Sequence, residues 1–333
     1  MAIVERLDRF QKRHPAAGFP LGVLYKYIDD GGGNLAALIA YYAFLSLFPL
    51  LLLLTTVLGL VLVGHPHLQQ QVLTSTVAQL PVVGQELGQP DRIGGGALGL
   101  TVGVLGALYG GMGVGQAAQN AMNTVWAVPR NSRPDPFKAR GRSLLLLGTA
   151  GLAVLGTTFL TALGGSNVGS LGPVLKVVVL LASVAVNALV FVFVFRVATA
   201  RVLSNRDVAP GALAAALVWQ LLQTFGVVYV KHVAHSASAT NGVFALVLGL
   251  LAFFYLTGAA VVMCAEINAV RVDRLHPRSL LTPFTDNVEL TRADQRSYTD
   301  QAKAQRFKGF EEVDVTFNDP GDHAADRAEA DDE

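Results

Sequence analysis

Six long apolar stretches, almost free of charge, constrain this chain more than any other feature of its sequence. Each is near or above the roughly 20 residues with which a helix crosses a hydrocarbon core of about 30 Å. Their apolar residues run continuously and do not alternate with period two, which favours helices over barrel strands. The predicted spans are Leu35–Val63, Ala97–Met122, Ser143–Leu163, Val174–Phe195, Pro210–Val230 and Gly242–Ala265. We therefore predict an all-α polytopic membrane protein, a bundle of six transmembrane helices.

Composition excludes most other classes of protein. Hydrophobic residues make up 52% of the 333 residues and charged residues only 15%, whereas a soluble domain carries about 25% charge. A soluble enzyme, a disulfide scaffold and a disordered protein are all disfavoured. The single cysteine, Cys264, has no partner for an internal disulfide.

The sequence divides into three regions. Residues 1–34 form a basic arm in which apolar residues share helical faces, so we expect amphipathic helices there, with a solvated arm as the alternative. Residues 35–270 hold the six spans, with a large external loop at 64–96 that is predicted to contain a short helix around 68–80. Residues 271–333 form a polar, acidic tail that we predict to be largely disordered from about residue 283.

The placement of basic residues predicts the orientation. All but three of the 25 lysines and arginines lie in the N-terminal arm, in the loops after the second and fourth spans, or after the sixth span; the exceptions are Arg92, Lys176 and Lys231. Cytoplasmic segments are enriched in such residues. This pattern predicts that both termini are cytoplasmic and that the number of spans is even.

Motifs for catalysis or for cofactor binding are absent from the sequence. It contains no Walker sequence, HExxH, GxSxG or paired-cysteine motif. The glycines from Gly110 to Gly115 superficially resemble a nucleotide loop, but they lie inside a span, where close helix packing explains them better. Acidic residues outside the tail are scattered singly or in the Asp29-Asp30 doublet. We expect no enzymatic activity, no catalytic residue, no metal and no cofactor.

Polar residues inside the spans are the candidate functional residues, because each costs free energy in hydrocarbon and usually faces the bundle interior. Four in the second span recur at i, i+3, i+4 and i+7 and share one helical face: Gln116, Gln119, Asn120 and Asn123. The other candidates are Tyr41 and Tyr42 in the first span, Asn187 in the fourth, and Gln220 and Gln223 in the fifth. Two interpretations stay open: interhelical hydrogen bonds, worth roughly 0.6–2 kcal/mol each, or a water-accessible transport path open to the cytoplasmic leaflet.

Glu266 closes the sixth span and is followed by Asn268 and Arg271. A carboxylate at this boundary either pairs with a cytoplasmic arginine or responds to protons or lipid headgroups at the mouth of a cavity. We include Glu266 and Asn268 among the candidates for the transport path.

Several short segments resemble the YihY/BrkB family of bacterial inner-membrane proteins. They are YYAFLSLFPL at 41–50, QNAMNTVW at 119–126, Pro-Gly-Ala at 210–212 and CAEINA at 264–269. His65-Pro66 and GLLAFFY at 249–255 are most similar to the YhjD branch. The resemblance extends from about Tyr25 to Arg274 and leaves out the acidic tail.

The resemblance implies a multi-pass protein of the bacterial inner (plasma) membrane with six helices. Members of this family were once labelled ribonuclease BN, which is regarded as a mistake, and others are linked to envelope integrity and serum resistance. The YhjD branch is associated with moving lipids or lipid-A precursors across the inner membrane. The resemblance supplies no catalytic residues.

Together these features favour a transporter or flippase-like protein for a lipid or another amphipathic component of the cell envelope. The alternatives are an exporter of osmolytes or small solutes and a membrane scaffold that transports nothing; a ribonuclease is disfavoured. The expected partners are membrane lipids, through anionic headgroups at the cytoplasmic face, and not nucleic acids. The sequence leaves homo-oligomerisation open.

Overall fold

The computed structural model describes residues 2–62, 96–164, 172–236, 239–282, 284–285 and 288–318, and all regular secondary structure within these ranges is helical. The predicted all-α class is confirmed. Nearly all of the predicted external loop lies outside the described residues, and so does its predicted short helix.

Six long helices coincide with the six apolar stretches. They are α3 (Gly32–Leu62), α6 (Gly96–Val125), α7 (Pro136–Gly164), α8 (Gly172–Ala198), α9 (Asn205–Ser236) and α10 (Ala239–Val272). Within the described residues, two segments are long and apolar enough to cross a membrane, Val177–Ala198 and Val247–Val272. The six helices are confirmed as helices, and the crossing of the membrane by all six stays a prediction.

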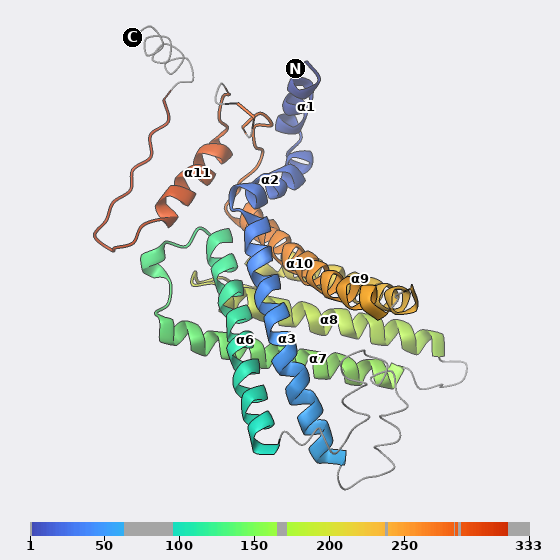
Figure 1. The fold of residues 1–333 in the computed structure, drawn as a ribbon. Helices are drawn as coiled ribbons and strands as arrows, with labels where there is room; N and C mark the ends of the chain where they lie inside the picture. Colours follow the sequence, from blue (N-terminus) through green and yellow to red (C-terminus); the bar gives the residue numbers. More distant parts are fainter. Residues whose placement is uncertain are drawn as a thin grey trace.

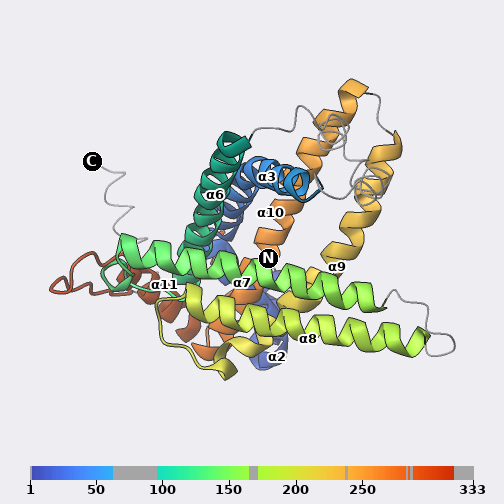
Figure 2. The same ribbon diagram turned by 90° about the horizontal axis from the view of Figure 1, so that it is seen from below.

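The six long helices form a closed ring in chain order (Figure 1). Each packs against the next along the chain, and α10 packs back against α3. Figure 2 shows the same ring from below, with α3 beside α6, α7 beside α8, and α9 beside α10. These pairs converge where α6, α8 and α10 end and diverge toward the opposite end. Further contacts of α6 with α8 and α10 tie the ring together.

The hydrophobic core lies at this convergent end. Its buried side chains come from the last turns of α6, α8 and α10 and from the first turns of α9: Ala121, Met122, Val125, Phe195, Ala198, Val208, Ala212, Val262, Ala265 and Ala269. Farther from this end, many large apolar side chains are more than half exposed: Leu105, Leu152, Val178, Leu181 and Leu248. Such apolar surface suits a hydrocarbon environment better than water.

The convergent end is also where the basic segments meet, and we call it the basic end. It comprises α2, the loops at 126–135 and 199–204, and the chain after α10. Arg130 lies 4.8 Å from the ring centre of Phe307, and Arg201 binds Asp273. The four segments that the sequence assigned to one side of the membrane thus lie together.

Glycines let α6 approach its two neighbours closely. A Cβ atom on Gly110 would lie 2.7 Å from the Cα atom of Ser46 in α3, and one on Gly115 would lie 2.7 Å from the Cβ atom of Ser143 in α7. Both separations are shorter than real Cβ contacts. The interpretation of these glycines as packing residues is therefore confirmed.

Two shorter helices precede the ring, α1 (Ala2–Arg13) and α2 (Pro15–Asp29). α2 packs on α10 and buries Val23 and Lys26, whereas Leu24 and Ile28 remain exposed. Gly31, with φ of +64°, turns the chain from α2 into α3. The predicted N-terminal helices are present, and α2 is docked on the bundle instead of being a solvated arm.

The tail contains a further helix, α11 (Arg292–Ala304), so the prediction of disorder from about residue 283 is wrong for this segment. A capping box starts the helix: the Asp294 amide donates to Thr291 Oγ1 at 3.1 Å, and the Thr291 amide donates to the Asp294 carboxylate at 2.8 Å. Ala293, Ser297 and Ala304 are buried with Asp294. The polar composition of the whole tail hid this short docked segment. Residues 319–333 lie outside the described residues.

A joint between α9 and α10 forms where proline interrupts the hydrogen bonds of α9. Pro210 has no N–H, so the carbonyl of Arg206 loses its helical donor. Arg271 of α10 donates to that carbonyl at 2.5 Å. The Gly211 amide donates sideways to Asn268 Oδ1 at 2.7 Å. The polar residues that follow Glu266 thus satisfy backbone groups that Pro210 disturbs.

Gly211 is the most sensitive position of this joint. A Cβ atom there would lie 2.1 Å from the carbonyl oxygen of Cys264, so α9 and α10 would have to separate. We expect Gly211→Ala to lower the unfolding free energy by about 1–3 kcal/mol, the usual cost of overpacking, measured by thermal unfolding in detergent.

Gly148→Ala is the matched control, because a Cβ atom at Gly148 in α7 would meet nothing within 4 Å. Alanine is a better helix former than glycine, so this variant should keep or raise the melting temperature. Equal destabilisation by both variants would contradict the close approach at Gly211.

Candidate functional site

A cluster of buried charges lies at the basic end, between α2 and α10. The side chain of Lys26 is 2% exposed, forms an ion pair with Asp30 and faces Glu266, with Nζ 3.9 Å from Oε2. Its Nζ also donates to the carbonyl of Val125, at the end of α6, over 3.2 Å. One ammonium group therefore holds α2, α6 and α10 together.

The surroundings keep Lys26 charged. Burial by itself lowers the pKa of an ammonium group, because it removes the charge from water. The carboxylates of Glu266 and Asp30 outweigh that effect, and the pKa of Lys26 ends above its ordinary value. The charge is thus a permanent part of this interface at neutral pH.

Glu266 is the least satisfied member of the cluster. It is fully buried, and neither of its carboxylate oxygens accepts a hydrogen bond from the described residues. Its counter-charge on Lys26 is shared with Asp30. Such a carboxylate is costly to bury, since ion pairs offset desolvation only when hydrogen bonds complete them. The structure gives Glu266 a lysine of α2 as its partner, and not the arginine considered from the sequence.

A second buried cation, Arg278, ties the tail to α2. Its fully buried guanidinium forms ion pairs with Asp294 of α11 and, at 2.8 Å, with Asp29 of α2. Burial by itself lowers the pKa of Arg278. The two carboxylates raise the pKa by more than burial lowers it, so the pKa lies above its ordinary value. Arg278 therefore links α11 to α2.

The Asp29-Asp30 doublet joins the two charge clusters. Asp29 pairs with Arg278, whereas Asp30 pairs with Lys26 and accepts a hydrogen bond of 2.8 Å from Gln301 of α11. Sequence reasoning missed Lys26 and Arg278 as site residues. The i,i+4 spacing of Lys26 and Asp30 was the one local signal available.

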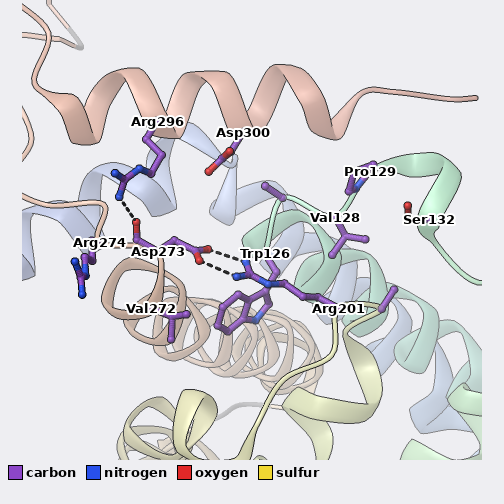
Figure 3. A pocket seen from close by; sticks show the side chains of 12 residues that line it. Trp126, Val128, Pro129, Ser132, Arg201, Val272, Asp273, Arg274, Arg296 and Asp300 are labelled. Carbon is purple, nitrogen blue, oxygen red and sulfur yellow. Dashed lines mark hydrogen bonds and ion pairs between the residues drawn. The ribbon is translucent and has the colours of Figure 1, made fainter. Parts of the chain in front are cut away.

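A pocket of about 750 Å³ lies beside these clusters, between the end of α6, the loop before α9, the end of α10 and α11 (Figure 3). Arg201 reaches both carboxylate oxygens of Asp273 at 2.9 Å, and its guanidinium lies 5.1 Å from the ring centre of Trp126. Arg296 donates to the backbone carbonyl of Asp273 at 2.9 Å. The charged residues of the pocket are Arg201, Asp273, Arg274, Arg296 and Asp300. No cluster of His, Cys, Asp or Glu suited to a metal ion occurs within the described ranges.

The predicted stripe on α6 begins with one exposed and one buried glutamine. Gln116 is exposed. Gln119 is buried and donates to the carbonyl of Ala139 and to Ser143 Oγ, both in α7 and both at 2.9 Å. Gln119 therefore makes interhelical hydrogen bonds.

The two asparagines of the stripe bind the loops of the basic end. Asn120 Oδ1 accepts from Arg133 at 3.0 Å, in the loop after α6. Asn123, which is buried, accepts from the amide of Ala200 at 2.7 Å, in the loop after α8. Of the four stripe residues, Gln119 thus makes the interhelical bonds of the first interpretation and the two asparagines bind loops instead; the role of the stripe in transport stays a prediction.

The remaining predicted residues are dispersed over the ring. Tyr41 is exposed and Tyr42 half-buried, and Asn187 is buried with no hydrogen-bond partner for its Nδ2 among the described residues. Gln220 is half-buried and Gln223 exposed. None of the predicted path residues lines the pocket described above.

The fold and these buried charges define an all-helical membrane protein whose charged groups gather at one end. The chain belongs to the BrkB virulence-factor family, whose sequence profile matches residues 23–286. The resemblance predicted from the sequence is confirmed.

Two relatives illustrate how far this similarity extends. An uncharacterized protein of Dickeya dadantii (strain 3937) is 27% identical over 262 residues, covering 72% of this chain and 79% of that protein. The inner membrane protein YhjD of Escherichia coli (strain K12) is 24% identical over 292 residues, covering 80% and 85% respectively. No solved structure matches the chain significantly.

The docking of α11 can be tested at Asp294. Asp294→Ala removes the carboxylate half of the capping box and one partner of the buried Arg278. Trypsin should then cut the exposed Arg296 and Lys303 of α11 faster, by about tenfold for each 1.4 kcal/mol of docking free energy that is lost. Cleavage is followed by gel mobility and mass spectrometry.

Gln295→Ala, at the exposed neighbouring position, should leave the rate of trypsin cleavage unchanged. If both variants are cut at the wild-type rate, Asp294 does not hold α11 on the bundle.

Proposed function

We propose that this protein is a transporter or flippase-like protein of the bacterial inner membrane for a lipid or another amphipathic envelope component, and that it is not an enzyme. Its partners in this proposal are membrane lipids, recognised by their headgroups at the basic end. The single observation that carries the proposal is Glu266, a carboxylate buried at the inner end of an apolar helix to which no described residue donates a hydrogen bond.

Glu266 supports transport for an energetic reason. An ionisable residue within a membrane helix is expensive and usually marks a substrate, ion or proton pathway. Here the carboxylate shares Lys26 with Asp30 and accepts no hydrogen bond within the described structure. A group held in this state can exchange its partner for a proton or for a cationic group at lower cost than a fully paired carboxylate.

Three further features support a lipid as the substrate. The outward halves of the long helices expose large apolar side chains, while arginines and lysines gather at the basic end. The relative YhjD is by name an inner membrane protein. A solute exporter is the alternative, and the assay below separates the two.

The proposed topology has six spans and places the basic end and both termini in the cytoplasm. Single cysteines near Gln85 and at Ser236 should then react with an impermeant maleimide added to intact cells. Cysteines at Ser132 and Asn205 should react only after the cells are opened, because they lie on the basic side. The native Cys264 is buried and is replaced by alanine in all variants. External labelling at Ser132 would overturn the six-span arrangement.

The proposed activity is tested with purified protein in liposomes. Scrambling of fluorescent lipids and efflux of small solutes are measured in parallel, at equal amounts of folded protein. Glu266→Gln should slow lipid movement by about tenfold, equivalent to roughly 1.4 kcal/mol of activation free energy, and should change its dependence on pH.

Glu289→Gln, at an exposed position after α10, removes an equal charge and should leave the rate unchanged. Solute efflux without lipid movement would favour the exporter. Absence of both activities in the wild-type protein would favour a scaffold that transports nothing.

A further inference from the structure

The pocket at the basic end carries charges of both signs, and two helices end in its wall. Two residues after the ends of α6 and α10, respectively, lie Ala127 and Arg274, which both line the pocket and have positive φ angles of 47° and 53°. In each case the amide of the next residue bonds back to a carbonyl five residues earlier, from Val128 to Asn123 and from Leu275 to Val270. Both helices therefore close with the Schellman motif.

Arginine is an unexpected residue at the left-handed position of such a motif. Glycine usually occupies it, because a side chain there costs roughly 1–2 kcal/mol. No described residue forms a hydrogen bond or an ion pair with the Arg274 side chain, so no such bond within the described structure offsets that cost. A strained, unpaired arginine at the edge of a pocket suggests that its guanidinium serves a ligand.

We propose that this pocket binds a zwitterionic group in which a phosphate is joined to a primary amine, as in a phosphoethanolamine headgroup. This proposal names the chemical class of the substrate for the proposed transport, and its relevance to transport rests on that proposed function. The phosphate lies toward Arg274 and Arg296, and the ammonium lies toward Asp300 and the carboxyl ends of α6 and α10.

Two arginines beside the pocket can bind the anionic part of the ligand. Arg201 is neutralised by its two-pronged ion pair with Asp273 and is held against Trp126. Arg296 uses one N–H on a neutral carbonyl and keeps its charge. Neither Arg274 nor Arg296 forms an ion pair with a described residue, so both guanidinium groups remain beside the pocket, and such groups match phosphate oxygens in geometry.

The cationic part of the ligand has a partner in Asp300. This side chain points from α11 toward the pocket, one turn after Arg296 (Figure 3). It has no hydrogen bond or ion pair within the described structure. Burial, followed by the neighbouring Asp273, raises the pKa of Asp300, which an ammonium group would reverse. Helix carboxyl ends favour cations, and two of them meet here.

The size and place of the pocket agree with a headgroup. Its volume of about 750 Å³ falls within the range of small-ligand sites. It lies at the end of the bundle, where the proposed topology puts the inner headgroups. Trp126, whose indole lines it, belongs to a residue type that is enriched at membrane interfaces.

Binding can be read from Trp126 itself. The chain has two tryptophans, so Trp219→Phe leaves Trp126 as the only reporter of fluorescence. Glycerophosphoethanolamine is titrated against the full-length protein in detergent, beside glycerol phosphate and ethanolamine as the separate halves. We expect the zwitterion to bind at least about tenfold more tightly than either half, which corresponds to roughly 1.4 kcal/mol.

A pair of glycine variants separates function from strain. Arg274→Gly and Ala127→Gly both relieve a left-handed residue and should keep or raise the melting temperature. Arg274→Gly should weaken binding of glycerophosphoethanolamine about tenfold or more, whereas Arg292→Gln, at an exposed arginine that does not line the pocket, should not. Equal binding by the two arginine variants would overturn the assignment of Arg274.

The contribution of Asp300 is tested in the same way. Asp300→Asn should weaken binding of the zwitterion and leave binding of glycerol phosphate equal or stronger, while Glu289→Gln changes neither. If wild-type protein binds glycerol phosphate as tightly as the zwitterion, the pocket is a plain anion site and the proposal fails.

A further set of titrations, with lipids in micelles, distinguishes a lipid headgroup from a soluble ligand. Mixed micelles with phosphatidylethanolamine should change Trp126 fluorescence at lower concentration than those with phosphatidylglycerol, if the headgroup is part of a lipid. A response to the soluble zwitterion alone would support the pocket but assign it to a soluble ligand. Binding without lipid movement in liposomes would overturn the proposed transport only. If lipids move in liposomes but the protein binds glycerol phosphate as tightly as the zwitterion, only the proposed pocket would be overturned.

Discussion

Two buried cations, Lys26 and Arg278, hold the basic end of this protein together. Each must be surrounded by carboxylates or carbonyls, because an unpaired charge in a protein interior costs several kcal/mol. Lys26 contacts Asp30, Glu266 and the end of α6, and Arg278 forms ion pairs with Asp29 and Asp294. The N-terminal helix, the ring and the tail helix are therefore fixed relative to one another by the same electrostatic requirement.

The segments that resemble the family, together with residues near them, have an architectural explanation. The glycines of α6 allow close contact with α3 and α7, and Pro210-Gly211 opens α9 to the side chains of Asn268 and Arg271. Glu266 differs from Asn268 and Arg271, because neither of its carboxylate oxygens accepts a hydrogen bond in the described structure. It is therefore a buried charge whose role in the architecture is limited to its contact with Lys26.

The pocket and the charge clusters belong to one assembly. Val125 accepts the hydrogen bond of Lys26, and the next residue, Trp126, lines the pocket. α11 contributes Asp294 and Gln301 to the clusters and Arg296 and Asp300 to the pocket. In the proposed function, a headgroup in the pocket would therefore adjoin the Lys26–Glu266 pair. Movement of α11 would change both sites together.

The sequence by itself determined the helices, their apolar character, the family and the segregation of basic residues, because these depend on periodicity and composition along short stretches. It also marked Glu266 as a candidate. Only the tertiary structure decided which residues the buried charges pair with. Lys26 and Val125 are 99 residues apart and Arg278 and Asp29 are 249 apart, and no local pattern records such pairings. For the same reason α11 escaped prediction: its polar sequence resembles a solvated tail, and it is ordered by Asp294 meeting Arg278, a contact that exists only once the chain has folded.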